Sequence, residues 1–532
     1  QGPSLVTRAG GGLGIAAPGP ARHKFVTVTF GGKLDVGDSL RSNRSGIGTR
    51  WQAHAGRFAT SGVTLPTTTG PGQSLQPTQI GLGGKPQLDM LEMVWPDGVF
   101  QSELALKAGT TRRVTETQRQ LSSCPVLFAW NGEAYAFVTD LIGVGGLGYL
   151  VKPGVYGSPR PFERLLLDQD QLVPRAGRLA LKLGEPMEEA CYLDHVAMQQ
   201  VDVPEGWAVA LDERAGVNPP LPTSELLFYR PDQVIAPESA VNDRGEDMLA
   251  AIDQRDGVAA DVGPVDPRFI GMLEREHQLT VTFAQPIDDD ARVPVLLIDG
   301  WIEYPYSQTN FAAWQAGLEH EEPTIEARNA EGQWVRLLDK FGYPAGMPRA
   351  MSVPLANLPP GTTELRIRTN LEIYWDRLRI AYPEPCPEAA IVDLPLRGGS
   401  LARVGFARRS TGPQRRPHYD YQQRPPTWDA RHPLGYYTRF GDVTELLTRR
   451  EDAVAIFGPG EEVHFEFEAP KAAPGPGVTR WYVLSAAGWC KDMDMYTATG
   501  GTLEPLPRTS DTVNPDRDRL HTEYNTRLEA GR

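Results

Sequence analysis

Short runs of alternating apolar and polar residues, bounded by turn-forming residues, recur along the whole chain. Residues 463–467 alternate apolar and charged side chains with a period of two, as a half-buried strand does. Asn131-Gly132 separates two apolar runs, and this dipeptide favours the positive φ values of a hairpin turn. Further turns are predicted at 96–98, 331–332 and 458–460. The pattern indicates a mainly β protein.

Helical patterns are few. Residues 237–253 and 443–447 are the two segments that we predict to be short helices. The predicted fold class is therefore mainly β, with several β-sandwich or jelly-roll-like modules in tandem and few short helices.

The chain of 532 residues is too long for one hydrophobic core, and about three to four domains are expected. Composition shifts and Pro-rich stretches set the expected boundaries. They are an irregular lead-in (1–22), a first β module (23–120), a β domain (121–232), a linker with a short helix (233–274), a galactose-binding-like β-sandwich (275–383), a C-terminal β domain (384–510) and a polar tail (511–532).

Composition excludes some classes of protein. The formal net charge of -14 argues against a nucleic-acid binder, because phosphate contacts need a basic face. No apolar run approaches the roughly 20 residues of a membrane-spanning helix. The chain begins abruptly at Gln1 in a Gly-rich segment, so we expect a removed leader or the C-terminal part of a longer precursor.

The four cysteines lie far apart, at Cys124, Cys191, Cys386 and Cys490. Without a C-x-x-C pair, zinc ribbons and thioredoxin-type redox sites lack support. A disulfide between Cys124 and Cys191 is one prediction, because both residues fall in the same expected domain. Buried thiols, which behave as small apolar groups, are the alternative.

Two sequence patterns resemble ligand-binding motifs, but each lacks a part that the site would need. Residues 143–148 match G-x-G-x-x-G, but the following 149–154 cannot form the helix that a dinucleotide site needs. The acidic clusters at 168–170, 288–290 and 516–518 lack the full pattern of a calcium loop. We therefore predict no cofactor, with a weak surface calcium site as the alternative.

Catalytic signatures are also missing. The chain has neither G-x-S-x-G nor H-E-x-x-H. Cys191, Asp194 and His195 are close in sequence, yet in a strand Asp194 points away from the other two. We predict a protein without catalytic activity, and an enzyme with an unrecognised site at a domain junction stays the alternative.

Aromatic residues gather in two loop-like segments. The candidate ligand or partner contacts are Trp301, Tyr304, Tyr306 and Trp314 in the first, and Tyr419 and Trp428 in the second. Exposed aromatic rings stack on sugars or anchor protein interfaces. The alternative is that they pin long loops onto the sandwiches. The second segment also contains five arginines between 408 and 424, suited to an anionic partner or to pairing with acidic residues of the same chain.

An ordered series of signatures near the N-terminus resembles the ASPIC and UnbV domain. Residues 43–50 read Asn-Arg-Ser-Gly-Ile-Gly-Thr-Arg, followed by Gln73-Ser74, by Gly81-Leu82-Gly83 and by Val-Trp-Pro-Asp-Gly at 94–98. Thr49 and Ile80 depart from the usual pattern. Five later segments also resemble bacterial members of this family, related to cartilage acidic protein 1: 441–447, 458–462, 488–494, 504–507 and 524–527.

The resemblance implies export and an architecture, but no catalytic residues. Family members usually carry an FG-GAP, integrin-like β-propeller with calcium loops before this module, and this chain has no such propeller. We expect a secreted, periplasmic or cell-surface protein that acts in binding, adhesion or scaffolding. Its expected partners are proteins, such as a separate FG-GAP propeller chain or further copies of itself. Carbohydrate binding by the aromatic loops of 275–383 is the alternative; nucleic acid is not an expected partner.

Overall fold

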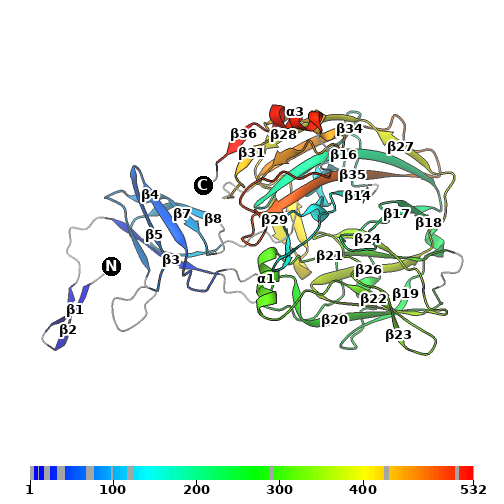
Figure 1. The fold of residues 1–532 in the computed structure, drawn as a ribbon, viewed down its shortest axis with the longest axis horizontal. Helices are drawn as coiled ribbons and strands as arrows, with labels where there is room; N and C mark the ends of the chain where they lie inside the picture. The colour runs from blue at the N-terminus through cyan, green and yellow to red at the C-terminus, as the bar shows by residue number, and fades with distance from the viewer. Residues whose placement is uncertain are drawn as a thin grey trace. The chain divides into compact units, whose positions relative to one another are not determined.

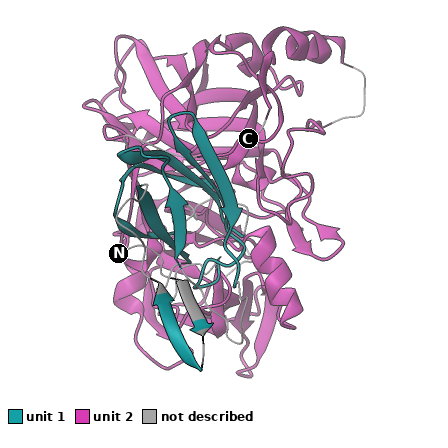
Figure 2. Ribbon diagram, turned by 90° about the vertical axis from the view of Figure 1, so that its left-hand side faces the viewer, with its two compact units in different colours: residues 1–118 teal, residues 119–532 magenta. Residues whose placement is uncertain are grey.

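The computed structural model describes residues 5–9, 11–16, 24–32, 42–66, 77–96, 100–116, 125–168, 170–287, 292–424, 430–509 and 514–530. Strands make up 48% of it and helices 8%, which confirms the mainly β prediction. The chain divides into two compact units, residues 1–118 and residues 119–532 (Figure 2). No helix in the described ranges is long and apolar enough to cross a bilayer.

The first unit encloses one apolar core between two sheets. An antiparallel sheet of order β5-β4-β7-β8 consists of β4 (Arg50–Ala55), β5 (Phe58–Val63), β7 (Gln87–Val94) and β8 (Phe100–Lys107). A second sheet of order β6-β3-β9 consists of β3 (Phe25–Gly31), β6 (Thr78–Gly81) and β9 (Thr111–Thr115), with β3 and β9 parallel. The shared core includes Val26, Val28, Phe30, Leu91 and Met93. Apolar and polar residues alternate along β3 from Val26 to Phe30, and burial alternates along most of β7, which places these side chains in the core.

The lead-in contains a hairpin that the sequence prediction missed. Residues 1–22 were expected to be irregular, but β1 (Leu5–Ala9) and β2 (Gly12–Ala16) pair in antiparallel register. Gly11 lies between them with a positive φ of 85°, which suits a tight turn. Both strands are only five residues long and β2 contains two glycines, so their sequence carries little strand signal.

The larger unit holds two β-sandwiches (Figure 1). In the first, here called the interleaved sandwich, two sheets share a core that includes Leu181, Met198, Phe465 and Leu484. One sheet has the order β11-β10-β15-β34-β28-β32: β10 (Val126–Trp130), β11 (Tyr135–Asp140), β15 (Arg178–Gly184), β28 (Leu396–Arg403), β32 (Gly441–Asp442) and β34 (Glu461–Glu468). The other has the order β14-β35-β16-β27, with β33 also paired to β16: β14 (Phe162–Leu167), β16 (Glu189–Pro204), β27 (Ala390–Leu394), β33 (Ala455–Phe457) and β35 (Val478–Asp492).

This topology corrects the expected boundaries of two domains. Residues 121–232 and 384–510 were predicted as separate domains, yet β15 pairs with β34, and both β14 and β16 pair with β35. Both segments therefore contribute strands to each sheet of one sandwich. The sequence shows local hairpins but gives no signal for pairing between strands that lie about 280 residues apart in the chain.

The second sandwich, here called the inserted sandwich, lies between those two segments in the sequence and spans 237–381. Its five-stranded sheet has the order β19-β20-β25-β22-β23: β19 (Pro237–Asn242), β20 (Met272–Phe283), β22 (Thr324–Arg328), β23 (Trp334–Leu338) and β25 (Glu364–Leu371). Its three-stranded sheet has the order β24-β21-β26: β21 (Val295–Ile302), β24 (Arg349–Pro354) and β26 (Ile373–Ala381). Leu279, Ile298, Ile367 and Ile380 belong to the common core.

Shorter elements complete the unit. Four further two-stranded sheets are β12 (Leu150–Lys152) with β13 (Val155–Tyr156), β17 (Ala208–Leu211) with β18 (Leu226–Tyr229), β29 (Arg408–Thr411) with β30 (Pro417–Asp420), and β31 (Gly435–Tyr437) with β36 (Arg527–Glu529). The described helices are α1 (Ser307–Gln315), α2 (Thr444–Leu447) and α3 (Pro515–Tyr524), with 3-10 turns η1 (Gly143–Gly145), η2 (Pro231–Gln233), η3 (Leu249–Ile252) and η4 (Pro413–Arg415).

The helix predictions succeed only in part. The helix predicted at 443–447 is present as α2, which confirms it. The one predicted from 237 is wrong, because 237–242 is strand β19 and only the 3-10 turn η3 follows. Hydrogen bonding of β19 to the neighbouring β20 outweighs a weak local helix preference. Helix α1 lies in the segment that was read as a loop.

The expected polar tail is also folded onto the core. Asn514 caps α3: its side chain accepts from the backbone N–H groups of Asp516 and Arg517, and Pro515 occupies the first turn. Leu520 and Tyr524 from this helix belong to the core of the interleaved sandwich. Asn514-Pro515 followed by acidic residues in the first turn is a helix-start signal, and it is stronger here than the polar composition on which the prediction of a tail rested.

The predicted turns have mixed outcomes. The Asn131-Gly132 hairpin joins β10 to β11, but its loop spans 131–134 rather than two residues. The Asn131 carboxamide accepts from the N–H of Glu133 and Ala134, which fixes that longer loop. Glu331-Gly332 joins the paired strands β22 and β23. The turn at 458–460 joins no hairpin, because β33 and β34 lie in different sheets.

Candidate functional site

Trp301, the first candidate contact, is buried in the structure. Its side chain is 1% exposed, and its ring stacks on Tyr374 at a centroid distance of 5.5 Å. The indole Nε1 donates a hydrogen bond to the main-chain oxygen of Gln414, 2.8 Å away. Trp301 therefore cannot offer a face to a sugar, and it instead holds the arginine-rich segment against the inserted sandwich.

The other candidate contacts are mostly enclosed too. Tyr306 is buried against Met187 and Ile270, and Tyr419 is buried in a cluster with Phe128. Tyr304 is half-buried, with its ring edge-on to Tyr343. These placements fit the alternative that the aromatic residues pin loops onto the sandwiches.

Trp314 is the candidate contact that remains open to solvent among the described ones. Its side chain is 46% exposed at the end of α1, and its ring is 5.8 Å from Phe311. Phe311 in turn stacks on Tyr496 at 4.2 Å. Trp428 lies outside the described residues.

One arginine of the arginine-rich segment, Arg415, pairs with an acidic group of the same chain. Arg415 Nε lies 2.7 Å from Glu372 Oε1, and the Tyr374 hydroxyl donates to the same carboxylate at 2.5 Å. Burial raises the pKa of Glu372, while Arg415 acts to lower it. Gln414 adds two hydrogen bonds with the main chain of Ala259. These contacts favour the intrachain interpretation of this segment over an anionic partner.

The glycine-rich loop at 143–148 has a packing role. It forms the 3-10 turn η1, and a Cβ added to Gly145 would lie 2.4 Å from the main-chain oxygen of Gly488 in β35. Strand β12 follows instead of a helix. Close packing of backbone on backbone therefore explains this glycine, and the loop lacks the geometry of a dinucleotide site.

Cys191 makes a contact that the sequence did not predict. Its thiol donates to Glu185 Oε2, 2.8 Å away, and both groups are buried. Burial raises the pKa of Glu185 to about 8, while the hydrogen bond from Cys191 acts in the opposite direction. Cys124 lies outside the described residues, so its pairing with Cys191 stays a prediction.

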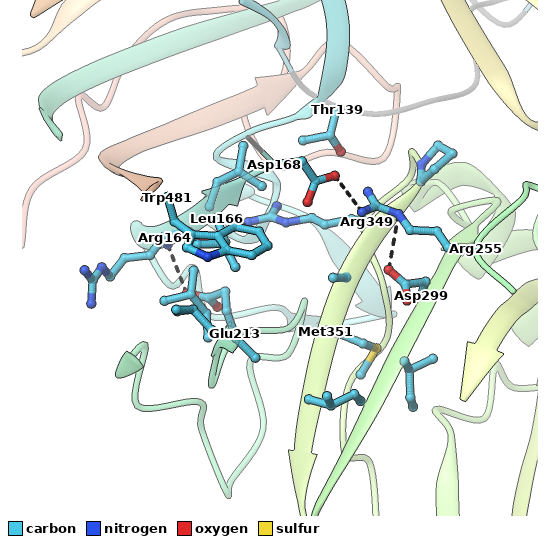
Figure 3. A pocket seen from close by; sticks show the side chains of 18 of the residues that line it. Thr139, Arg164, Leu166, Asp168, Glu213, Arg255, Asp299, Arg349, Met351 and Trp481 are labelled. Carbon is cyan, nitrogen blue, oxygen red and sulfur yellow. Dashed lines mark hydrogen bonds and ion pairs between the residues drawn. The ribbon is translucent and has the colours of Figure 1, made fainter. Parts of the chain in front are cut away.

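The structure contains a cavity of about 140 Å³ where the outer faces of the two sandwiches meet (Figure 3). A single water needs roughly 10–15 Å³, so this cavity has room for a small molecule. Its walls come from β14, β17, β18, β21, β24, β26 and β35 together with the loop that carries Arg255. Four arginines line it: Arg164, Arg255, Arg349 and Arg377. We call it the arginine cavity.

Arg255 and Arg377 share one carboxylate, that of Asp299. Arg377 stands directly opposite Asp299 in the pairing of β26 with β21, and the two are 2.7 Å apart. Arg255 lies 3.4 Å from Asp299 and 2.7 Å from Asp168. Burial alone would lower the pKa of Arg255, but Asp299 and Asp168 outweigh it and raise that pKa. Two cations therefore converge on one buried anion.

Several donor groups at the cavity, and one acceptor, Oδ1 of Asp299, take part in no hydrogen bond within the described residues. Within the described residues, Nη2 of Arg255 and Nη1 of Arg377 take part in no hydrogen bond. Nε of Arg164 and Nε1 of Trp481 are buried donors that no described residue accepts from, and both residues line the cavity. Buried donors in native proteins are nearly always satisfied by protein or by ordered water, so the acceptor for Arg164 Nε and Trp481 Nε1 is water or a ligand. The side chains of Arg255 and Arg377 are 37% and 40% exposed, so their open donors are accessible to either.

The back wall of the cavity is a rigid ion-pair network. Glu213 accepts from Arg160 at 2.6 Å, from the Arg164 backbone N–H at 3.0 Å and from the Ser224 hydroxyl at 2.8 Å. Arg349 pairs with Glu163 at 3.2 Å. Glu213 and Glu163 are thus held by fixed partners, whereas Oδ1 of Asp299 is buried and has only the 3.4 Å ion-pair contact with Arg255 among the described residues.

No sequence motif marked this cavity. Its arginines lie at least 28 residues apart in the chain, on four different segments, and each looks like an ordinary exposed residue of a strand or loop. Only the alternation Arg377-Leu378-Arg379 gave a local hint, since it places both arginines on the outer face of β26. Within the described residues, no group of three His, Cys, Asp or Glu side chains has the arrangement of a metal site.

The comparison with protein families concerns the first unit. Residues 38–121 match the family model described as ASPIC and UnbV, and the chain thus carries an ASPIC and UnbV domain. No curated protein matches the chain. In this domain the signature residues build turns: Asn43 exchanges two hydrogen bonds with the backbone of Ile47, and Gly46 has a positive φ of 61° against Phe30.

Proposed function

We propose that the protein is a binding protein, without catalytic activity of its own, that acts outside the cytoplasm, secreted or in the cell envelope. Its ligand site is the arginine cavity, and the ligand is a small molecule with a carboxylate or phosphate group. The observation that carries this proposal is that four arginines line one cavity, where donor groups of Arg164, Arg255, Arg377 and Trp481 have no acceptor among the described residues. Nη1 and Nη2 of both Arg164 and Arg349 bond to the wall of the cavity. The ASPIC and UnbV domain supports export through the resemblance described above.

The chemistry of the walls favours an anion with an apolar part. Guanidinium groups bind carboxylate and phosphate in a two-pronged, charge-assisted geometry. Trp481, Leu211 and Met351 supply apolar surface beside them. Tyr229 adds a hydroxyl whose pKa burial raises, so it remains a neutral donor at physiological pH. The cavity volume suits a compact molecule better than a polysaccharide.

Calorimetric titration of residues 1–532 with a panel of compact anions tests the proposal. The panel contains inorganic phosphate, succinate, benzoate and galacturonate. The variant Arg377→Gln removes one cation, and we expect binding to weaken by about tenfold or more, since a charge-assisted hydrogen bond contributes about 1.5–3 kcal/mol. Arg397→Gln is the matched control, because Arg397, on β28, pairs with Glu468 of β34 and does not line the cavity. Failure of every anion to bind would contradict the proposal.

A second role, in assembly with protein partners, rests on a separate observation. Tyr436 of β31 and Leu528 of β36 are directly opposite each other, and both are more than half exposed. Exposed aromatic and aliphatic pairs of this kind anchor protein interfaces. Candidate partners are further copies of the chain or an FG-GAP propeller chain.

Sedimentation analysis of the chain and of its Tyr436→Ser variant tests the assembly role. If this surface is an interface, the substitution lowers the mass of the complex. Val392→Ser, on the exposed edge strand β27, is the control. Equal masses for all three proteins would argue against this surface as the contact.

A further inference from the structure

Cys191 and Cys490 lie opposite each other near one end of the paired strands β16 and β35 of the interleaved sandwich. Strands β16 and β35 are antiparallel, and their register places Cys191 directly across from Cys490. Directly opposed residues of an antiparallel pair project from the same face of the sheet. The two sulfur atoms therefore lie on one side of the sheet, in the interior.

The backbone hydrogen bonds of Cys490 show whether Cys191 and Cys490 form a hydrogen-bonded or a non-hydrogen-bonded pair of the two antiparallel strands. The Cys490 carbonyl accepts from Leu147 N–H at 2.8 Å, and Gly488 N–H donates to Pro161 at 3.0 Å. Both partners lie on the side of β35 away from β16. Because the N–H and C=O of one strand residue point to the same side, Cys490 turns both groups away from Cys191. The two cysteines thus form a non-hydrogen-bonded pair.

The geometry of such a pair fits a disulfide. Opposed Cα atoms in a non-hydrogen-bonded pair are about 4.5 Å apart. Disulfides bridge Cα atoms that are roughly 4.4–6.8 Å apart, so the backbone of β16 and β35 needs no large movement. In this structure both residues are thiols, and the Cys191 thiol donates to Glu185. We propose that oxidation joins Cys191 and Cys490 in a disulfide bond between the two central strands of the five-stranded sheet, and that the hydrogen bond to Glu185 is lost when the bond forms.

The remaining cysteines are less suited to either partner. Cys386 lies in a different cluster, with Val203 and Trp207, and its sulfur is near Glu388. Cys124 lies outside the described residues. The structure therefore gives Cys191 a partner other than Cys124, the residue that sequence reasoning had chosen. The bond would close a loop that contains the entire inserted sandwich.

The bond forms by exchange with a disulfide of an external oxidant, such as glutathione disulfide or a disulfide-bearing oxidoreductase. The Cys191 thiolate attacks that disulfide and releases one thiolate of the oxidant. The Cys490 thiolate then attacks the Cys191 sulfur and releases the second. Two thiol protons leave and two electrons pass to the oxidant. Cys191 is fully buried and Cys490 is 5% exposed, so the exchange takes place during folding, before the strands are covered.

Peptide mapping under non-reducing conditions tests the proposal. The full chain is unfolded, reduced and refolded in a glutathione redox buffer, then digested and analysed by mass spectrometry. The expected product is a linked peptide pair that contains Cys191 and Cys490, with Cys386 recovered as an alkylated thiol. A peptide that links Cys191 to Cys124, or alkylation of all four cysteines, would overturn the proposal.

A stability comparison gives a second readout that does not depend on mapping. We expect Cys490→Ala to lower the melting temperature by about 5 °C or more under oxidising conditions, since a long-loop disulfide restrains the unfolded chain. Addition of a reductant should remove most of the difference between this variant and the unsubstituted protein. Cys386→Ala is the control. Reductant should change its melting temperature by the same amount as that of the unsubstituted chain. An equal response of Cys490→Ala and the unsubstituted chain to reductant would contradict the bond.

Discussion

The indole Nε1 of Trp301 donates a hydrogen bond to the main-chain oxygen of Gln414, 2.8 Å away. Gln414 and the next residue, Arg415, both have positive φ, at 52° and 55°. Two successive non-glycine residues in this region are strained and persist only where their surroundings fix them. Trp301 and the Glu372–Arg415 ion pair supply that fixation. Trp301 therefore stabilises the strained loop at residues 414–415.

Substitution of Trp301 should change stability. We expect Trp301→Phe to lower the free energy of unfolding by about 1 kcal/mol, because it keeps a ring on Tyr374 but loses one hydrogen bond. Trp301→Ala should cost about 3–5 kcal/mol through the cavity it leaves. Urea unfolding curves measure both. Trp314→Ala, at an exposed position, should stay within about 0.5 kcal/mol.

The same variants distinguish a stabilising role of Trp301 from carbohydrate binding by the aromatic loops. On a glycan array, a sugar-binding role for the aromatic loops would show as binding that Trp314→Ala abolishes. If Trp301 stabilises the loop instead, we expect Trp301→Ala to speed proteolysis near residues 412–416. Unchanged stability and proteolysis of Trp301→Ala would contradict it.

Asp140 should make stability depend on pH. Its carboxyl group is buried and accepts from Gly346 N–H at 3.1 Å, and burial raises its pKa to about 7. The unfolded chain ionises near pH 4, so the native state binds more protons between the two values. Its contribution to stability is full below about pH 4 and is lost as pH rises to about 7.

The variant Asp140→Asn removes this titration while keeping an acceptor for Gly346. We expect its free energy of unfolding to fall less between pH 4 and pH 7, by up to a few kcal/mol, than that of the unsubstituted protein. Denaturant titrations at several pH values measure the difference. Asp393→Asn, at an exposed site on β27, is the control. Parallel stability curves for all three proteins would exclude Asp140 as the source.

Asn514→Ala should destabilise the protein even though it lies near the C-terminus. The substitution removes the cap of α3, at a cost of about 1 kcal/mol. Asn514→Asp retains a capping oxygen and should recover most of the loss. Thermal unfolding detects the change only if α3 belongs to the cooperative core, as its buried Leu520 indicates. No shift in melting temperature for Asn514→Ala would show that the helix is not part of that unit.

Local features of the fold could be predicted from the sequence, and long-range ones could not. Period-two alternation and the Glu331-Gly332 turn identified β22 and β23 because hairpins are encoded by neighbours in the chain. The pairing of β15 with β34 has no such local code. A single sandwich was therefore divided into two expected domains. Helix α3 was predicted as part of a polar tail for a different reason. Most of its residues are polar, and only Leu520 and Tyr524 on one face are buried.

The candidate site was harder to predict than the fold. Sequence reasoning selected aromatic residues, since clusters of them are visible in the chain, but burial of Trp301 and Tyr419 depends on contacts made by distant segments. The arginines of the cavity lie on four segments and become neighbours only when the two sandwiches pack together. The donors at the cavity that lack a partner among the described residues are a consequence of that packing and have no counterpart in any motif.

Charge recognition in the arginine cavity is tested most directly by comparing an anion with its neutral analogue. Calorimetric titration of the full chain with benzoate and with benzamide, which has a similar shape, measures what the charge contributes. The account predicts that benzoate binds at least tenfold more tightly than benzamide, and that Arg377→Gln reduces this preference while Arg397→Gln preserves it. Equal affinities for the two compounds, or a preference that Arg377→Gln leaves unchanged, would contradict it.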